Sequence, residues 1–268
     1  MRETQDFKDF SIDNWYKEFK DVTIKTVILE LSRDVLNCFS CTETLEDENL
    51  ESNEAPFPQE FKDQVKNAFN TLGRIIFVKN NWHAPSDAKM FSFGNTLIAE
   101  NIDDIKLYLT TSGIIQEDFS TVKGVTFCLC LRPWINIHPA AEFRCIVINN
   151  VLRGITPRDW PTYYSHFKEE GPQIIEKLLT FFATNIKDKF LRKNYVFDVV
   201  LSYPEKPFLL DFGALNCKTN LYAFSWKEIS PLLNKEVPEE VAPVFRYLES
   251  DIGIMTKGAA LQKFRLSE

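Results

Sequence analysis

Two apolar runs, residues 194–201 and 207–212, are separated by five residues that include Pro204 and Glu205. A proline beside charged residues between two such runs predicts an antiparallel β-hairpin. A turn centred on residues 204–205 predicts three cross-strand pairs: Asp198 with Asp211, Val200 with Leu209, and Val196 with Gly213. The other face of the hairpin carries only apolar side chains, those of Phe197, Val199, Leu201, Phe208, Leu210 and Phe212. Both faces of the hairpin are therefore expected to be covered.

The pair formed by Asp198 and Asp211 interrupts this apolar pattern. Directly opposed side chains lie about 4.5–5.5 Å apart, where like charges repel each other. Two carboxylates in apolar surroundings need a cation or a shared proton. A single aspartate of this kind could simply cap a loop, but for an opposed pair we favour a divalent-metal site.

Composition restricts the class of protein. The chain has 268 residues, 44% of them hydrophobic, which suffices for one large domain or two small ones with a buried core. A formal charge of −7 gives no support to nucleic-acid binding through overall electrostatics. The six cysteines are expected to be reduced, because no apolar N-terminal segment directs the chain to an oxidising compartment. No run reaches the ~20 apolar residues of a membrane span, so we do not expect membrane binding. We expect a monomeric cytoplasmic protein that does not bind nucleic acid.

Cys38 and Cys41 form an isolated C-x-x-C motif. A structural zinc site needs a second pair of ligands at a suitable spacing, and the three histidines of the chain are scattered. A thioredoxin-like motif opens a helix after a strand, whereas this one leads into an acidic stretch. Neither kind of site is favoured.

Periodicity predicts strands mixed with helices and joined in part by hairpins, which is typical of an α+β fold with antiparallel sheets. The expected strands are 23–31, 74–78, 126–134, 142–148 and 151–156, the last two joined by a tight turn at Asn149-Asn150. The expected helices are 61–72, 102–109, a stretch within 160–191 that is broken or kinked near Gly171-Pro172, and a short one from Ser225. The acidic stretch around 40–60 is most simply a loop, or alternatively an acidic docking arm.

Charged residues interrupt several of these strands, namely Lys79, Arg132, Glu142 and Arg144. Glu142 and Arg144 point to the same face of a strand and could pair with each other at the surface. Together with the two aspartates, however, the set supplies cations for phosphates and carboxylates for magnesium. Neither a P-loop nor a G-x-G-x-x-G motif is present, and Asp211-Phe212-Gly213 matches the kinase D-F-G motif by coincidence, because the other kinase motifs are missing.

Longer strings carry a resemblance to a known family. Residues 77–88 read FVKNNWHAPSDA, 131–134 read LRPW, 141–145 read AEFRC, 158–160 read RDW, 196–198 read VFD and 210–212 read LDF. With similar segments at 15–29, 224–228 and 243–246, the chain resembles the cell division cycle protein 123 family over nearly its whole length. The resemblance implies an ATP-grasp-like fold with two lobes, expected here at residues 1–130, which include the acidic loop, and 131–268, which carry the metal hairpin.

The resemblance also implies a function. Family members act as chaperones that bind the γ subunit of eukaryotic translation initiation factor 2, promote assembly of the heterotrimer and so support translation initiation and cell-cycle progression. The implied ATP-binding residues are Lys79, Asn81, Trp82, Asp87, Arg132, Trp134, Glu142, Arg144 and Arg158, and the implied magnesium ligands are Asp198 and Asp211. A nucleotide-binding chaperone is favoured over an enzyme with turnover, and no catalytic residue is expected.

One position departs from the family pattern. The family usually has asparagine after the second Asp-Phe, as a further oxygen ligand, and this chain has Gly213. Water or Asn216 would have to substitute, so we expect Mg-ATP binding to be weaker than is usual in the family. Two alternatives stay open: a diverged paralogue that has weak or no ATP binding, and an ATP-grasp ligase.

Overall fold

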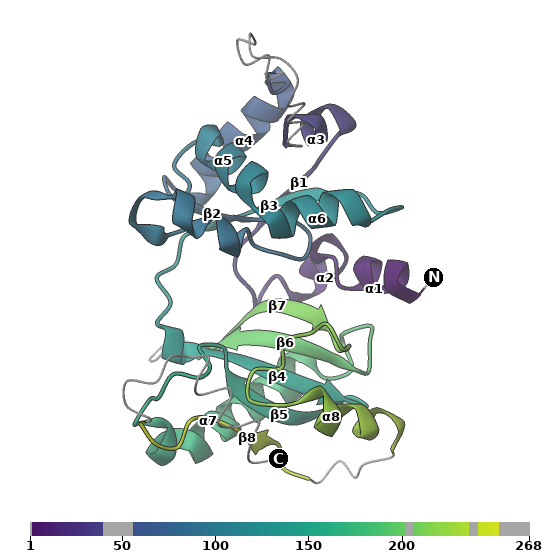
Figure 1. Cartoon of the computed structure of the whole chain (residues 1–268), viewed down its shortest axis with the longest axis vertical. Coiled ribbons are helices and arrows are strands. Elements are labelled where there is room, and N and C mark those ends of the chain that lie inside the picture. Colours follow the sequence, from purple (N-terminus) through teal and green to yellow (C-terminus); the bar gives the residue numbers. More distant parts are fainter. Residues whose placement is uncertain (1, 40–55, 202–205, 236–240, 252–268) are drawn as a thin grey trace. The chain divides into compact units, whose positions relative to one another are not determined.

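The computed structural model describes residues 2–39, 56–201, 206–235 and 241–251 (Figure 1). The chain divides into two compact units. The first contains residues Met1–Asn14 and Ile24–Ile135, and the second contains Trp15–Thr23 and Asn136–Glu268. The predicted turn at residues 204–205, most of the acidic stretch and Cys41 lie outside the described residues.

The first unit is built on a three-stranded antiparallel sheet in the order β1-β3-β2, as far as the residues are described. Its strands are β1 (Val27–Glu30), β2 (Ile76–Lys79) and β3 (Cys128–Pro133), and its helices are α1 (Arg2–Asp9), α3 (Arg33–Phe39), α4 (Gln59–Leu72), α5 (Ile102–Thr111) and α6 (Gly113–Thr121), with 3-10 turns at Ser86–Phe91 and Phe93–Asn95. Val78 pairs with Leu131, and both are buried in a core with Val65 of α4 and Ile105 of α5. That face of the sheet is therefore the helix-covered face.

The second unit contains, among the described residues, a five-stranded sheet in the order β7-β6-β4-β5-β8, whose first four strands can be followed in Figure 1. The strands are β4 (Glu142–Ile148), β5 (Val151–Pro157), β6 (Tyr195–Val200), β7 (Phe208–Ala214) and β8 (Val244–Phe245), and only β8 is parallel to its neighbour. The helices are α7 (Phe167–Phe181), continued by a π-turn at Phe182–Ile186, and α8 (Trp226–Ile229), followed by a 3-10 turn at Ser230–Asn234; a further 3-10 turn spans Pro139–Ala141. Helix α2 (Ile12–Phe19) begins in the first unit and ends in the second.

The two faces of this second sheet are covered differently. On one face, Phe167 at the start of α7 lies 5.8 Å from Phe143 between ring centroids, and Phe182 stacks on Phe197. On the other face, Leu221 and Ile229 cover an apolar patch that includes Ile146, Ile148 and Val196. The rest of this second face carries Glu142, Arg144, Asp198 and Asp211.

Most predicted elements are confirmed, including the α+β class, the helices at 61–72 and 102–109 and the hairpin of β4 and β5. Asn149 and Asn150 both have positive φ, 53° and 59°, as a type I′ turn requires. The cross-strand pairs Asp198 with Asp211 and Val196 with Gly213 are also confirmed.

One prediction about these elements is wrong, and a second is wrong in part. Val200 pairs with Phe208 rather than with Leu209, because a register shift after Asp198 passes over Leu210. The sequence predicts a break or kink near Gly171-Pro172; α7 runs through both residues, so the break does not occur, and the kink stays a prediction. Pro172 removes only one backbone bond, and burial of apolar side chains along α7 holds the helix together: Phe167, Ile174, Leu178 and Phe181.

Two general features of the described residues bear on the predictions from composition. Five cysteines there are free: Cys38, Cys128, Cys130, Cys145 and Cys217. None of the helices in the described ranges combines the length and apolar character that a membrane crossing needs.

Candidate functional site

The eleven residues selected from the sequence fall into two groups, one in each unit. Lys79, Asn81, Trp82, Asp87, Arg132 and Trp134 belong to the first unit, and Glu142, Arg144, Arg158, Asp198 and Asp211 belong to the second.

Lys79 and Arg132 lie on the same face of the first sheet. Lys79 is paired with Cys130, and Arg132, two residues further along β3, is paired with Phe77. Paired residues share a face, so these side chains lie on the face opposite to the helix-covered one. Both are buried, at 2% and 3% exposure, and Arg132 donates from Nε to the hydroxyl of Thr26 over 3.0 Å. The arrangement presents two cations from neighbouring strands, which suits the binding of an anion.

Three other predicted residues in this unit make contacts that hold local structure together. Asn81 is fully buried and accepts from the Cys128 backbone N–H over 2.7 Å while its amide donates to Ser11. Trp82 donates from its indole to the Phe7 carbonyl over 2.7 Å. Asp87 accepts from Ser112 Oγ and the Ile114 N–H at the start of α6. Their predicted contacts with ATP remain predictions.

Trp134 follows β3 directly. Its backbone N–H donates to the Ile75 carbonyl over 3.2 Å, and its ring centroid lies 6.4 Å from that of Phe77. The side chain is half-buried at the end of the same strand that carries Arg132.

In the second unit, strand register places four polar side chains in one row across the sheet. Arg144 on β4 pairs with Thr156 on β5 and with Asp198 on β6, and Asp198 pairs in turn with Asp211 on β7. All four therefore share the face that also carries the apolar patch under α8. Asp198 is only 5% exposed, so its charge requires a close partner.

That partner is Arg144. Its Nε donates to Asp198 Oδ1 and its Nη2 to Oδ2, each over 2.8 Å, which makes a bidentate pair. Arg158 Nε lies 3.4 Å from the same Oδ2, and Arg158 Nη1 donates to Glu142 Oε2 over 3.0 Å. Glu142 and Arg144 thus have separate partners and do not form the surface pair considered from the sequence. Cross-strand neighbours on one face are closer than alternate residues along a strand, and this favours the observed pairing.

The charge of Asp198 raises the pKa of both arginines. Burial alone would lower the pKa of Arg144, but the charge of Asp198 and the hydrogen bonds to it more than offset this, and the net pKa is raised. For Arg158 the charge of Asp198 is the largest effect, and it raises the pKa of the guanidinium well above its usual value. Both side chains therefore remain positively charged on this face of the sheet.

Two residues of this network were not selected from the sequence. The Tyr222 ring lies over the Arg144 guanidinium, with 5.0 Å from its central carbon to the ring centroid, and the Tyr222 hydroxyl accepts from Arg158 Nε over 3.3 Å. The Asn220 carbonyl accepts from Arg144 Nη1 over 2.6 Å. Tyr222 has a positive φ of 55°, and its N–H donates to the Asn220 side chain. No periodicity or motif marks this loop, so only the structure identifies it.

The aspartate pair fits a magnesium ion in its chemistry. Magnesium is usually held by one or two carboxylates together with phosphate oxygens and water, and Asp198 and Asp211 are opposed on one face. The described residues contain no cluster of three or more His, Cys, Asp or Glu side chains suited to a metal. Asn216 accepts from the Lys218 N–H over 2.9 Å, so its oxygen is engaged in its own turn. A Cβ at Gly213 would lie 3.0 Å from Val196 Cγ2, which leaves little room for a third ligand side chain there.

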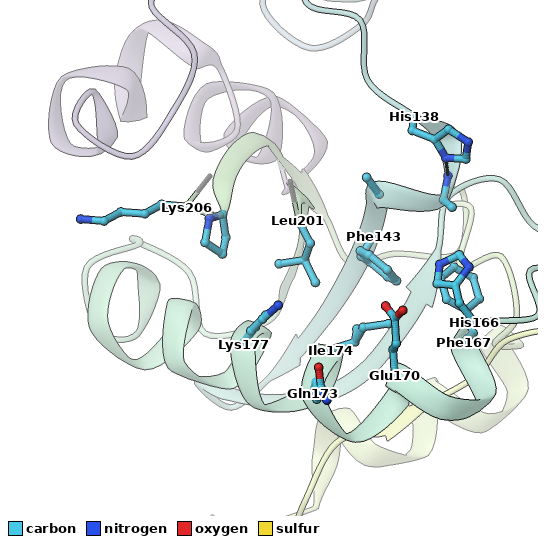
Figure 2. A pocket seen from close by; sticks show the side chains of 13 residues that line it. His138, Phe143, His166, Phe167, Glu170, Gln173, Ile174, Lys177, Leu201 and Lys206 are labelled. Atoms are coloured by element: carbon cyan, nitrogen blue, oxygen red, sulfur yellow. Dashed lines mark hydrogen bonds between the residues drawn. The ribbon is translucent and has the colours of Figure 1, made fainter. Parts of the chain in front are cut away.

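A cavity of about 460 Å³ opens on the face of the second sheet that α7 covers (Figure 2). It is lined by Glu170, Ile174 and Lys177 of α7 and, among others, by Phe143 and Leu201. None of the eleven candidate residues lines it, so it is separate from the row that contains Arg144, Asp198 and Asp211.

Comparisons with known proteins all point to one family. The family model described as D123 matches residues 37–267. A protein from Xenopus tropicalis named translation initiation factor eIF2 assembly protein is 29% identical over 280 residues, which cover 90% of this chain and 84% of the relative. Cell division cycle protein 123 from Yarrowia lipolytica is 30% identical over 228 residues, covering 74% and 61% of the two chains. C-terminally truncated Cdc123 from Schizosaccharomyces pombe shares the fold, with a TM-score of 0.77 and 22% identity over 91% of this chain and 97% of the other.

Proposed function

Because the chain belongs to the D123 family, we propose that it assists the assembly of translation initiation factor eIF2. The relatives that bear this name match most of the chain. The proposed partner is the γ subunit of the factor, and the proposed place of action is the cytoplasm, where it would support translation initiation and cell-cycle progression.

The proposal includes ATP and magnesium as ligands. The main support is in the second unit, where Arg144, Asp198 and Asp211 share one sheet face and Arg158 lies 3.4 Å from Asp198. Arg144 and Arg158 would bind phosphate oxygens, since guanidinium groups bind phosphate in a bidentate manner. Asp198 and Asp211 would hold magnesium, which neutralises phosphate charge when bound. In the first unit, Lys79 and Arg132 are proposed as further anion-binding cations.

Asp211 offers the sharpest test, because it is a proposed metal ligand but is not the bidentate partner of Arg144. Asp211→Asn keeps the size of the side chain and removes the charge. We expect calorimetry to show Mg-ATP binding by the wild type and at least about tenfold weaker binding by the variant. Glu176→Gln, at an exposed position of α7, is the matched control and should bind normally. Absence of Mg-ATP binding by the wild type would reject the ligand part of the proposal.

The partner is tested separately, by a pull-down with the isolated γ subunit of eIF2. We expect retention of the γ subunit by the wild type and by Glu176→Gln. Failure of the wild type to retain it, under conditions in which a characterised family member succeeds, would contradict the assembly function.

A second candidate is an assembly factor that binds its partner without nucleotide. Gly213 favours it, because this residue supplies no ligand oxygen and the adjacent Val196 fills the space. The two candidates differ in one combined result. The nucleotide-independent candidate would be supported if both the wild type and Asp211→Asn retain the γ subunit while neither gives heat of Mg-ATP binding.

A further inference from the structure

The carboxylate of Asp198 is already fully engaged by a cation of the chain itself. Each of its oxygens accepts an N–H of Arg144 over 2.8 Å, and Arg158 approaches Oδ2 at 3.4 Å. The side chains of Arg144 and Asp198 are 14% and 7% exposed, so water does little to screen their attraction. This is a closed ion pair at the place where the proposed function requires a metal ligand.

Arg144 is also held in this position by Asn220 and Tyr222. The Asn220 carbonyl accepts from its Nη1, and the Tyr222 ring lies over its guanidinium. These contacts come from one loop, whose own turn is closed by the bond from the Tyr222 N–H to the Asn220 side chain. The loop therefore favours the orientation in which Arg144 faces Asp198.

A divalent cation and the Arg144 guanidinium compete for the Asp198 carboxylate. Magnesium takes its oxygen ligands at about 2.0–2.1 Å in near-octahedral geometry, which requires direct access to a carboxylate oxygen. Two like charges on the same carboxylate also repel each other strongly in a poorly solvated position. Asp211 is half-buried, and it is the more accessible member of the aspartate pair.

We propose that Arg144 is an internal counter-ion that competes with the divalent cation for Asp198. In the nucleotide-free protein Arg144 neutralises Asp198, and Asp198 becomes a metal ligand only when Arg144 has left it. This inference rests on the magnesium site of the proposed function. Phosphate oxygens offer Arg144 an equivalent bidentate partner, so nucleotide and metal should each favour binding of the other. Metal alone should bind poorly.

The test uses Mn²⁺ alone as the probe, with the free ion measured by electron paramagnetic resonance in the absence of nucleotide. Arg144→Met removes the internal cation and keeps much of the side-chain length. We expect it to bind Mn²⁺ at least about tenfold more tightly than the wild type, and we expect Arg144→Met with Asp198→Asn to lose this gain. Arg246→Met removes a comparable bidentate arginine, from Glu228, and should leave Mn²⁺ affinity unchanged. Equal Mn²⁺ affinity of the wild type and Arg144→Met would overturn the proposal.

Arg144→Lys keeps the result decisive even if Arg144→Met does not fold. Lysine retains the charge but lacks the fork that contacts both oxygens at once, so an intermediate Mn²⁺ affinity is expected, and an affinity equal to that of the wild type would reject the competition. The outcome is separable from the proposed function. If the wild type binds Mg-ATP but the Arg144 variants bind Mn²⁺ no more tightly than the wild type, only the competition is rejected. If the variants bind Mn²⁺ more tightly but the wild type does not bind ATP, only the nucleotide part of the proposed function is rejected.

Discussion

Gly213 lies opposite Val196 on neighbouring strands, and replacing it by alanine should destabilise the second unit. A Cβ built at this position lies 3.0 Å from Val196 Cγ2, whereas carbon atoms make their best contact at about 3.5–4.0 Å. Val196 is β-branched, 1% exposed and located on a strand with neighbours on both sides, so its side chain has few alternative rotamers. The added methyl group therefore has to displace a side chain that cannot readily move.

The expected change in the free energy of unfolding follows from two opposing effects. Overpacking of a well-filled core typically costs about 1–3 kcal/mol, while removing glycine from a strand interior gains about 0.5–1 kcal/mol. We expect Gly213→Ala to lower the free energy of unfolding by about 0.5–2 kcal/mol. In the background of Val196→Ala, where the obstructing methyl group is absent, the same substitution should be neutral or stabilising.

The assay is urea unfolding, with the midpoint and slope compared across the four proteins of this cycle. Gly171→Ala is the matched control, because a Cβ there would lie 3.6 Å from Phe245, an ordinary contact, and the residue is inside α7. That control should stabilise the protein by up to about 1 kcal/mol. Unchanged stability of Gly213→Ala, or equal effects of this substitution with and without Val196, would refute the packing argument.

Three further predictions concern the same unit and the thiols. Adding the missing oxygen by Gly213→Asn in the Val196→Ala background should tighten Mg-ATP binding relative to Val196→Ala alone, and unchanged affinity in calorimetry would show that two aspartates suffice. Hydrogen bonding from Arg246 lowers the pKa of Glu228 from 4.5 to about 2. The contribution of Glu228 to stability is therefore complete above pH 4.5 and is lost as the pH falls toward 2. Glu228→Gln should therefore flatten the dependence of the urea midpoint on pH over this window, and parallel curves would contradict the assignment. Burial raises the pKa of Cys128 to about 12, so iodoacetamide at pH 8 should modify the exposed Cys217 and spare Cys128, as mass spectrometry of the peptides can verify.

Local patterns were sufficient for most individual elements of the fold. The helix at 61–72 follows from apolar residues at helical spacing, and those at positions 61, 65 and 68 are buried in α4. The two asparagines at 149–150 tolerate the positive φ that the tight turn requires. Patterns failed where packing outweighs a local preference, as at Pro172, which lies within a continuous helix.

The candidate site was predictable only in part, for a similar reason. Asp198 and Asp211 could be placed opposite each other from the sequence because both belong to one hairpin, although the register shift after Asp198 could not be predicted. Lys79, Arg132, Glu142 and Arg144 stood out because they interrupt apolar strands, and the remaining site residues came from the resemblance to a family. The row that Arg144 forms with the two aspartates depends on which strands are neighbours. Asn220 and Tyr222 lie in a loop that has no periodic pattern, so no sequence signal pointed to them.

The sequence alone predicts that two carboxylates face each other in apolar surroundings and need a cation or a shared proton, because alternation and turn chemistry act over a few residues. Which cation of the chain lies there depends on tertiary packing. Arg144 reaches Asp198 across 54 residues of sequence because β4 inserts beside β6. Strand order arises from the packing of whole layers and is not written in any local spacing.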